Sequence, residues 1–151
     1  MNGITQPTKA TDIKRTWHII DVKDMVLGRV SGKIAQLLMG KSKAYFAKNM
    51  DCGDFVVVIN AKSVKTTGKK EKGKVYTRYS GYPGGLHSET LAELRNRKPE
   101  EIVRHAVSGM LPKNRLHDRM LKRLYVFSGE EHPYENKIKD QNSKVKVVEA
   151  Q

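Results

Sequence analysis

Residues 55–60, Phe55-Val-Val-Val-Ile-Asn60, decide the fold class of this chain, because they are apolar at nearly every position. Such a run is typical of a strand that is buried on both faces of a parallel sheet. Another short apolar segment, Trp17-His-Ile-Ile-Asp-Val22, lies earlier in the chain, and a helical pattern separates the two. Strand, helix and buried strand in this order predict a βαβ unit, with a parallel sheet and a right-handed crossover.

The helix between these strands is predicted from apolar residues that recur at helical spacing from Val26 to Leu38. Gly40 follows at a position typical of a helix C-terminal cap. The segment Gly28-Arg-Val-Ser-Gly32 stands where a dinucleotide-binding loop would lie, but it does not match G-x-G-x-x-G, and no acidic residue follows the next strand. A nucleotide-dependent enzyme on a Rossmann-like sheet stays open as an alternative, and it predicts saturable binding of NAD or ATP.

The middle of the chain is predicted to continue with a strand, a turn and two helices. Lys74-Val-Tyr-Thr-Arg-Tyr79 is the expected strand, and the chain leaves it through Gly81-Tyr-Pro-Gly-Gly85. Ser88 is the candidate N-cap of a helix over residues 89–97. Pro99 stands like the first residue of the next helix. The apolar residues of that helix, which we expect to face the core, are Ile102, Val103, Ala106, Val107 and Met110.

A strongly basic segment follows. After Pro112 the pattern predicts another helix, with one apolar and one basic side. A stripe of cations on a helix that packs by its other side suits a polyanion, although an ordinary solvated face is the simpler interpretation of this segment alone. The expected apolar side contains Leu116, Met120, Leu121 and Leu124, and the expected basic side contains Arg115, Arg119, Lys122 and Arg123.

The charge balance of the whole chain also points to a polyanion. The chain has 29 Lys and Arg against 16 Asp and Glu, a formal net charge of +13. This charge exceeds what solubility requires and repels itself, unless a partner such as nucleic acid supplies the counter-charge. A membrane fits less well, because the longest apolar run, Phe55–Ile59, is far too short to span a bilayer. The single cysteine, Cys52, and the lack of a secretory signal predict a cytoplasmic protein.

No segment predicts catalysis or a metal site. Asp51-Cys-Gly-Asp54 contains two carboxylates, but such residues before a strand are usually turn formers. The five histidines show no paired spacing, and no second cysteine is present to complete a zinc site. No serine or cysteine has a readable base partner, although partners distant in the sequence stay open. We therefore expect no enzyme, no cofactor, no metal and no small-molecule substrate.

Two further basic clusters favour nucleic acid. The first lies between Lys62 and Arg78, where only Glu71 opposes the lysines, and the second follows the first helix and contains Lys41, Lys43 and Lys48. Flexible lysines suit phosphates because a point charge on a long stem needs no fixed geometry. Tyrosines 76, 79 and 82 lie close by, and Tyr82, within the glycine-rich turn, is the better candidate for stacking on an unpaired base. Tyr76 and Tyr79 are equally well interpreted as core residues.

Several of these segments, taken together, resemble those of a known family. The chain resembles the bacterial form of the large-subunit ribosomal protein L13 family over nearly its whole length. The segments that carry the resemblance are Trp17-His-Ile-Ile-Asp21, Leu27-Gly-Arg-Val30 with Ile34-Ala35, Gly40-Lys-Ser-Lys43, Asp51-Cys-Gly-Asp-Phe-Val-Val-Val-Ile-Asn-Ala61, Thr67-Gly-Lys69, Ser80-Gly-Tyr-Pro-Gly-Gly-Leu86, Gly109-Met-Leu-Pro-Lys113 and Leu124-Tyr-Val-Phe-Ser-Gly129. The polar, lysine-rich sequence after Tyr134 departs from the family's usual ending.

The resemblance implies a three-layer α/β/α fold around a small, mainly parallel sheet. It also implies a structural role: binding large-subunit (23S) rRNA early in assembly, beside neighbouring ribosomal proteins. We expect a polar N-terminal extension over residues 1–16, an rRNA-binding α/β domain over residues 17–128 and a polar, extended or partly disordered tail over residues 129–151. The residues expected to bind RNA are Lys41, Lys43, Lys69, Lys70, Arg78, Tyr82, Gly84, Gly85, Lys113, Arg115, Arg119, Lys122 and Arg123. The remaining alternative is a protein-only scaffold, which would lose nothing on nuclease treatment.

Overall fold

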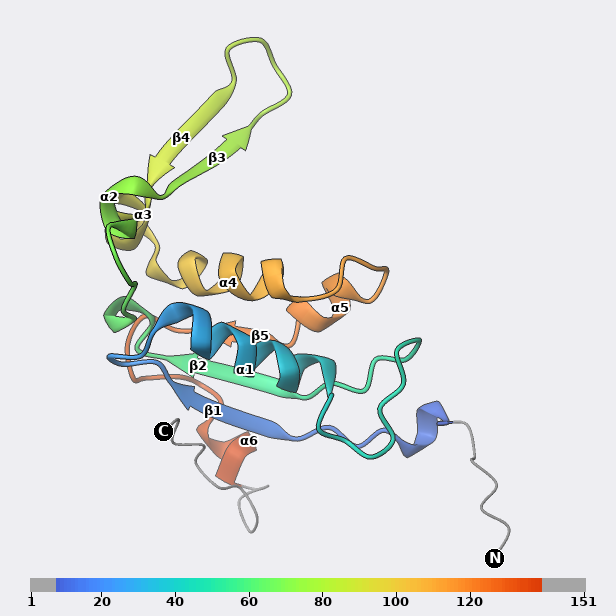
Figure 1. The fold of residues 1–151 in the computed structure, drawn as a ribbon. Helices are drawn as coiled ribbons and strands as arrows, with labels where there is room; N and C mark the ends of the chain where they lie inside the picture. The colour runs from blue at the N-terminus through green and yellow to red at the C-terminus, as the bar shows by residue number, and fades with distance from the viewer. Residues whose placement is uncertain (1–7, 140–151) are drawn as a thin grey trace, which may run out of the picture.

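The computed structural model describes residues 8–139 of the 151-residue chain. A three-stranded parallel sheet lies at its centre, in the order β1-β2-β5 (Figure 1). The three strands are β1 (Trp17–Asp21), β2 (Phe55–Ile59) and β5 (Leu124–Val126). The parallel βαβ unit predicted from the apolar run is therefore confirmed.

The central strand β2 is buried on both faces. Val56 and Val58 pack into the larger core, while Val57 lies in a second apolar cluster on the opposite face. Successive side chains of a strand point to opposite faces of its sheet, so a strand covered on both sides needs apolar residues throughout. The run at 55–59 is apolar for this reason.

Helices α1 (Leu27–Met39) and α4 (Pro99–Met110) pack against each other over one face of the sheet (Figure 1). α1 ends at Gly40, which has φ +75° and donates its backbone N–H to the carbonyls of Gln36 and Leu37, each at 3.0 Å. A Cβ at this position would lie 2.6 Å from the carbonyl oxygen of Cys52. Glycine is thus required here by conformation and by close approach.

α4 begins with Pro99, as expected, and buries Ile102, Val103 and Val107. Met110 does not complete this stripe, since 44% of its surface is exposed. The buried stripe is shorter than predicted because the chain turns away after the helix and Leu111 takes the buried position at its end.

The opposite face of the sheet is covered by the C-terminal segment, which makes the third layer. Trp17 stacks on Phe55 at 4.5 Å and on Tyr134 at 5.2 Å between ring centres. Ile138, from the short helix α6 (Glu135–Lys139), is buried against the same cluster. The expectation of an extended or partly disordered tail is therefore wrong for residues 134–139, because Tyr134 and Ile138 pack in the cluster around the indole. Residues 140–151 lie outside the described part of the chain.

The N-terminal extension is tied to the loop that follows α1. The hydroxyl of Thr8 donates to the carbonyl of Tyr45 at 2.9 Å, and the backbone N–H of Thr16 donates to Asp54 at 2.9 Å. A single 3₁₀ turn, η1 (Ala10–Asp12), lies between them, and a second, η2 (Ala61–Ser63), follows β2. Residues 1–7 of the expected extension lie outside the described chain.

A two-stranded antiparallel hairpin projects from the body (Figure 1). It consists of β3 (Val75–Tyr79) and β4 (Leu86–Thr90), it follows a short helix, α2 (Lys70–Gly73), and it leads into α3 (Leu91–Arg97).

The helix predicted over residues 89–97 is wrong at its start, because part of it belongs to the hairpin. Residues 86–90 pair with β3, so the helix begins only after Thr90. The Thr90 hydroxyl caps this helix by accepting from the backbone N–H of Glu93 at 3.3 Å. The backbone N–H of Thr90 in turn donates to the carboxylate of Glu93 at 2.7 Å. Ser88 is therefore a strand residue and not the N-cap.

The basic helix predicted after Pro112 is also shorter. α5 covers only His117–Leu121, and Leu124 lies in β5 opposite Val56. Pairing with the central strand outweighs helical periodicity here, because it gives the backbone of residues 124–126 a place in the sheet. Only Met120 of the expected apolar side is a buried helix residue.

Candidate nucleic-acid interface

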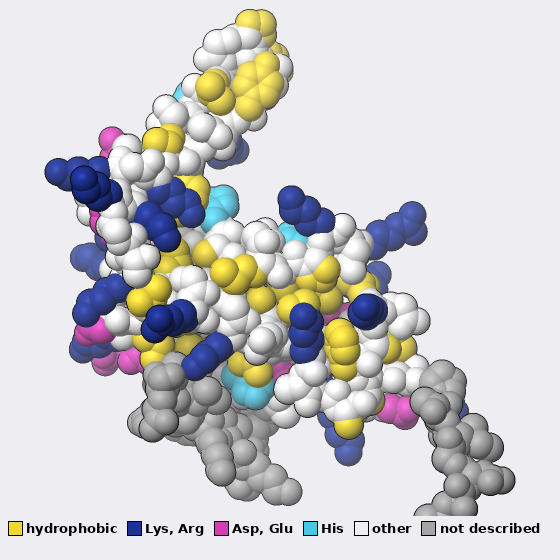
Figure 2. Space-filling view, viewed as in Figure 1, with side chains coloured by type: hydrophobic (Ala, Val, Ile, Leu, Met, Phe, Trp, Pro, Cys, Tyr) yellow, Lys and Arg dark blue, Asp and Glu magenta, His cyan; other side chains and the backbone are white. Residues whose placement is uncertain are grey.

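The segment around α2 carries a group of exposed cations. We call Lys69, Lys70, Lys72 and Lys74 the α2 cluster. The neighbouring Glu71 cannot neutralise them, since its carboxylate pairs with Arg95 at 2.7 Å and accepts from the hydroxyl of Thr66 at 2.8 Å. No carboxylate of the described residues pairs with any lysine of the cluster. Figure 2 shows Lys and Arg gathered at the base of the hairpin.

A second exposed group surrounds α5. We call Lys113, Arg115, Arg119 and Lys122 the α5 cluster. All four are exposed, and no ion pair within the described chain involves them. Asp118, the acidic residue within this segment, lies 3.3 Å from His117. This group therefore retains the accessible positive charge that a phosphate contact requires.

Arg123 does not belong to this surface, which corrects the prediction. It is only 5% exposed, and its two terminal nitrogens both contact the carboxylate of Asp51. One of them also donates to the carbonyl of Leu38 at 3.2 Å. The helical projection that placed it beside Arg119 does not apply, because α5 ends before residue 123.

Asp51 is the centre of a buried ion pair. Burial raises the pKa of its carboxyl, but hydrogen bonds and charge from Arg123, with a further contribution from Arg15 at 3.4 Å, outweigh burial and hold that pKa below its ordinary value. Asp51 is thus ionised at neutral pH. Its pair with Arg123 links the loop after α1 to the residue that precedes β5, so Asp51 is more than the turn former expected from the sequence.

Lys43, like Arg123, is held by a carboxylate within the protein. Its amine pairs with Asp54 and donates to the carbonyl of Lys14 at 2.6 Å. Burial raises the pKa of Asp54, but hydrogen bonds from His18, Lys43 and the backbone of Thr16 lower it below its ordinary value. Lys43 is therefore a poor phosphate ligand, whereas its neighbour Lys41 is exposed.

The hairpin presents aromatic and basic side chains away from the body. Tyr82, at its tip, is 74% exposed, and Tyr79 and Arg78 are exposed as well. Tyr76, in contrast, packs its ring against His105 at 5.5 Å between ring centres. The structure thus separates the three tyrosines: Tyr76 belongs to the body, while the other two face solvent.

The two candidate glycines of the turn differ. Gly84 has φ +73°, and the space where its Cβ would lie is open, so its backbone is accessible. A Cβ on Gly85 would lie 2.0 Å from the hydroxyl oxygen of Ser80. Gly85 is therefore required by the packing of the turn itself, which accounts for this glycine without any ligand.

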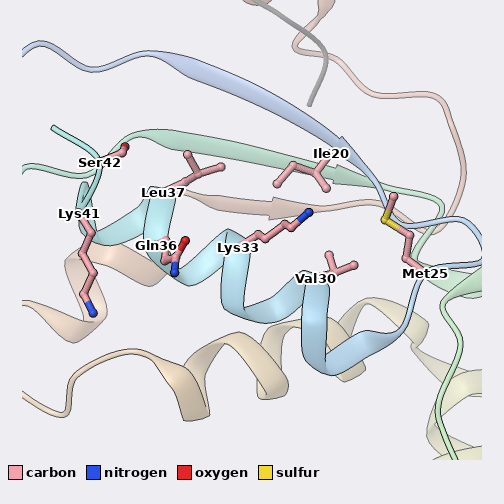
Figure 3. A pocket seen from close by; sticks show the side chains of 8 residues that line it. All are labelled: Ile20, Met25, Val30, Lys33, Gln36, Leu37, Lys41 and Ser42. Atoms are coloured by element: carbon pink, nitrogen blue, oxygen red, sulfur yellow. The ribbon is translucent and has the colours of Figure 1, made fainter. Parts of the chain in front are cut away.

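A cavity of about 500 Å³ lies between α1 and the edge strand β1 (Figure 3). Its floor is apolar and includes Ile20, Val30 and Leu37. Lys33 and Lys41 contribute to its rim, and no carboxylate, histidine or cysteine lines it. The cavity offers no pair of groups for acid–base catalysis.

No cluster of three or more His, Cys, Asp or Glu side chains within residues 8–139 is placed to hold a metal ion. No helix in the same part of the chain has the length and apolar character needed to cross a membrane.

Comparison with known proteins agrees with the geometry. Residues 15–133 match the family described as ribosomal protein L13. A large ribosomal subunit protein uL13 from Dehalococcoides mccartyi is 51% identical over 130 residues, which cover 86% of this chain and 91% of the relative. Its counterpart from Thermobifida fusca is 51% identical over 127 residues, covering 84% and 85% of the two chains. That from Syntrophotalea carbinolica is 47% identical, covering 86% and 92%.

The matched region runs from before β1 to beyond β5 and includes the α2 cluster, the hairpin and the α5 cluster. The relatives are named as ribosomal proteins and not as enzymes, in agreement with the prediction. Family match and identity over most of both chains lead to one conclusion: this chain belongs to the ribosomal protein L13 family.

Proposed function

We propose that this protein is a cytoplasmic, structural constituent of the large ribosomal subunit, where it binds 23S rRNA and supports early assembly and translation. The observation that carries the proposal is the pair of exposed basic clusters, at α2 and α5, that no carboxylate of the described chain neutralises. Together with the net charge of +13, they leave a positive surface that a polyanion can complete. Neighbouring ribosomal proteins are further partners.

The proposed mechanism is charge neutralisation on a rigid body. RNA segments repel one another, and cations held on separate elements allow such segments to pack side by side. The helices that give the two clusters their names, α2 and α5, lie near different ends of α4 in Figure 1. One recognition helix in a single groove would not need cations placed so far apart. The residues proposed to contact phosphates are Lys41, Lys69, Lys70, Arg78, Lys113, Arg115, Arg119 and Lys122.

The hairpin supplies a second kind of contact. Tyr82 is proposed to stack on an unpaired base, since its ring is exposed at the end of a projecting element. Gly84 permits close approach of the backbone beside it. Gly85, Lys43 and Arg123 are not included, because contacts within the protein account for all three.

A salt titration tests the electrostatic mechanism. About eight phosphate contacts, each contributing about 0.7 to 0.9, predict that log affinity for 23S rRNA falls against log salt with a slope of about −6 to −7. Filter binding between low and physiological salt measures this slope. A slope shallower than about −2, or retention of the protein in large subunits after nuclease treatment, would contradict the proposal and favour the protein-only scaffold.

A further inference from the structure

A groove of about 1,040 Å³ runs between the start of α1, the loop before α2 and the second half of α4. It was not recognised from the sequence, because its walls come from three segments far apart in the chain. Its volume matches the upper range of small-molecule sites.

The rim of the groove is basic on both sides. Lys69, Lys70 and Lys74 line it from the α2 side, and Arg29 lines it from α1. Thr66 and Thr67 lie on the same wall, where the Thr66 hydroxyl donates to Glu71, and no acidic residue contributes to the lining itself. A lining of this kind attracts a phosphate and repels a cationic peptide.

The floor of the groove is apolar and carries an aromatic ring. Ala106 and Met110 of α4 contribute apolar surface, and Met110 is 44% exposed. His105 also lines the groove, and its ring stacks on Tyr76 at 5.5 Å with an interplanar angle of 29°. Lys74 lies over the same tyrosine, with its amine 4.9 Å from the ring centre. Tyr76 does not line the groove itself but supports the His105 ring from beside it, and an apolar floor that ends at this imidazole suits the face of a nucleobase.

We propose that this groove binds one unpaired nucleotide of an RNA, with its base on the α4 floor and its phosphate at the lysines of the α2 cluster. The inference rests on the proposed rRNA binding and adds a distinct mode to it. The backbone of a regular duplex would be served by exposed cations on a convex surface and would leave the hollow unfilled. A base released from pairing uses both the floor and the rim.

The test uses the full chain and two RNA hairpins of about twelve base pairs, one with a single unpaired uridine in its stem and one without. Stacking of one base predicts that the unsubstituted protein binds the bulged hairpin about tenfold more tightly. Gly109→Trp fills the groove without changing a charge, and a side chain fits there because a Cβ at Gly109 meets no atom within 4 Å. This variant is expected to bind both hairpins alike, with the affinity that the unsubstituted protein has for the paired one.

Two further variants make the result unambiguous. Gly109→Ala makes the same backbone change without filling the groove, and it is expected to keep the tenfold preference. Gly28→Trp fills the groove from the opposite wall, where the space is also open, and should lose the preference. Thermal melts of all variants establish that they are folded.

The outcomes separate the two proposals. If the unsubstituted protein binds 23S rRNA and both hairpins without preference, or if both folded tryptophan variants keep the preference, the groove is not a nucleotide site and the proposed function stands. If neither hairpin nor 23S rRNA binds at low salt, both proposals fail together.

Discussion

The loop between α1 and β2 and the segment around α2 contain the same types of charged residue, but they use them in opposite ways. In the loop, Asp54 pairs with Lys43 and Asp51 pairs with Arg123, which reaches it from the residue before β5, and both cations are largely buried. Around α2, the one acidic residue is taken by Arg95, and the lysines are left exposed. The difference shows that the number of cations in a segment does not reveal a binding surface. What matters is whether the fold supplies each cation with a partner.

The largest effect is expected when the buried pair is broken. Arg123→Ala leaves the Asp51 carboxylate with only Arg15 as an ionic partner, and a broken buried pair costs about 3 to 5 kcal/mol of unfolding free energy. Urea denaturation measures this loss. Arg119→Ala is the matched control, since Arg119 is exposed, and it should change stability by less than about 0.5 kcal/mol. Equal effects of the two variants would contradict the comparison.

Lowering the pH should weaken the ion pairs of Asp51 and Asp54 without any substitution. The folded-state pKa values of Asp51 and Asp54 both lie below the ordinary value of 3.8. Their ionised forms therefore contribute stability that is present above pH 3.8 and is lost as the pH falls through the folded pKa values. Unfolding free energies measured from pH 6 down to pH 2 should show this decline. The decline should be shallower in the Asp51→Asn, Asp54→Asn double variant, and an unchanged decline would mean that other groups cause it.

Charge reversal at α5 should act on binding alone. Arg119→Glu together with Lys122→Glu removes two proposed phosphate contacts, and the affinity for 23S rRNA at low salt should fall on the order of a hundredfold. The melting temperature of the free protein should not fall, because both side chains are exposed and the chain is strongly basic. Unfolding of this variant, or rRNA binding at full strength, would show that the α5 cluster is misassigned.

The smallest effect is expected from a single lysine of the α2 cluster. Lys69→Ala should make the salt slope shallower by about one contact, with little change in stability. Lys43→Ala provides the contrast: its amine is held by Asp54, so it should lower stability and leave the salt slope unchanged. A reversal of these two results would exchange the roles assigned to the two regions.

The parts of the fold that could be predicted are those set by local pattern. The spacing of apolar residues from Val26 to Leu38 marked α1, Gly40 marked its end, and Pro99 marked the start of α4. The errors fell where long-range pairing competes with a local signal. Leu124 fits a helical face, but it pairs with Val56 in the sheet, and Ser88 resembles an N-cap, but it lies opposite Thr77 in the hairpin.

In the candidate site too, features set by local sequence could be predicted, and features set by long-range contacts could not. Exposed Lys69 and Lys70 could be found from sequence, since lysines in a polar loop stay in solvent unless a carboxylate reaches them. Arg123 could not be distinguished from Arg119, because its partner Asp51 is distant in the chain and meets it only through the fold. The groove beside α2 could not be found either, since Arg29, Thr66 and His105 come together only in three dimensions.

The sequence by itself determined the parallel α/β core, the strong positive charge and the resemblance to the ribosomal protein L13 family, because periodicity, composition and motif order are properties of the chain. Only the tertiary structure decided which cations are available. It buried Arg123 against Asp51, held Lys43 at Asp54 and brought Tyr134 and Ile138 onto Trp17. The physical reason is that a charged side chain stays available to a ligand only where no opposite charge is packed beside it. Which charges are packed together depends on the fold, because the partners are far apart in the chain.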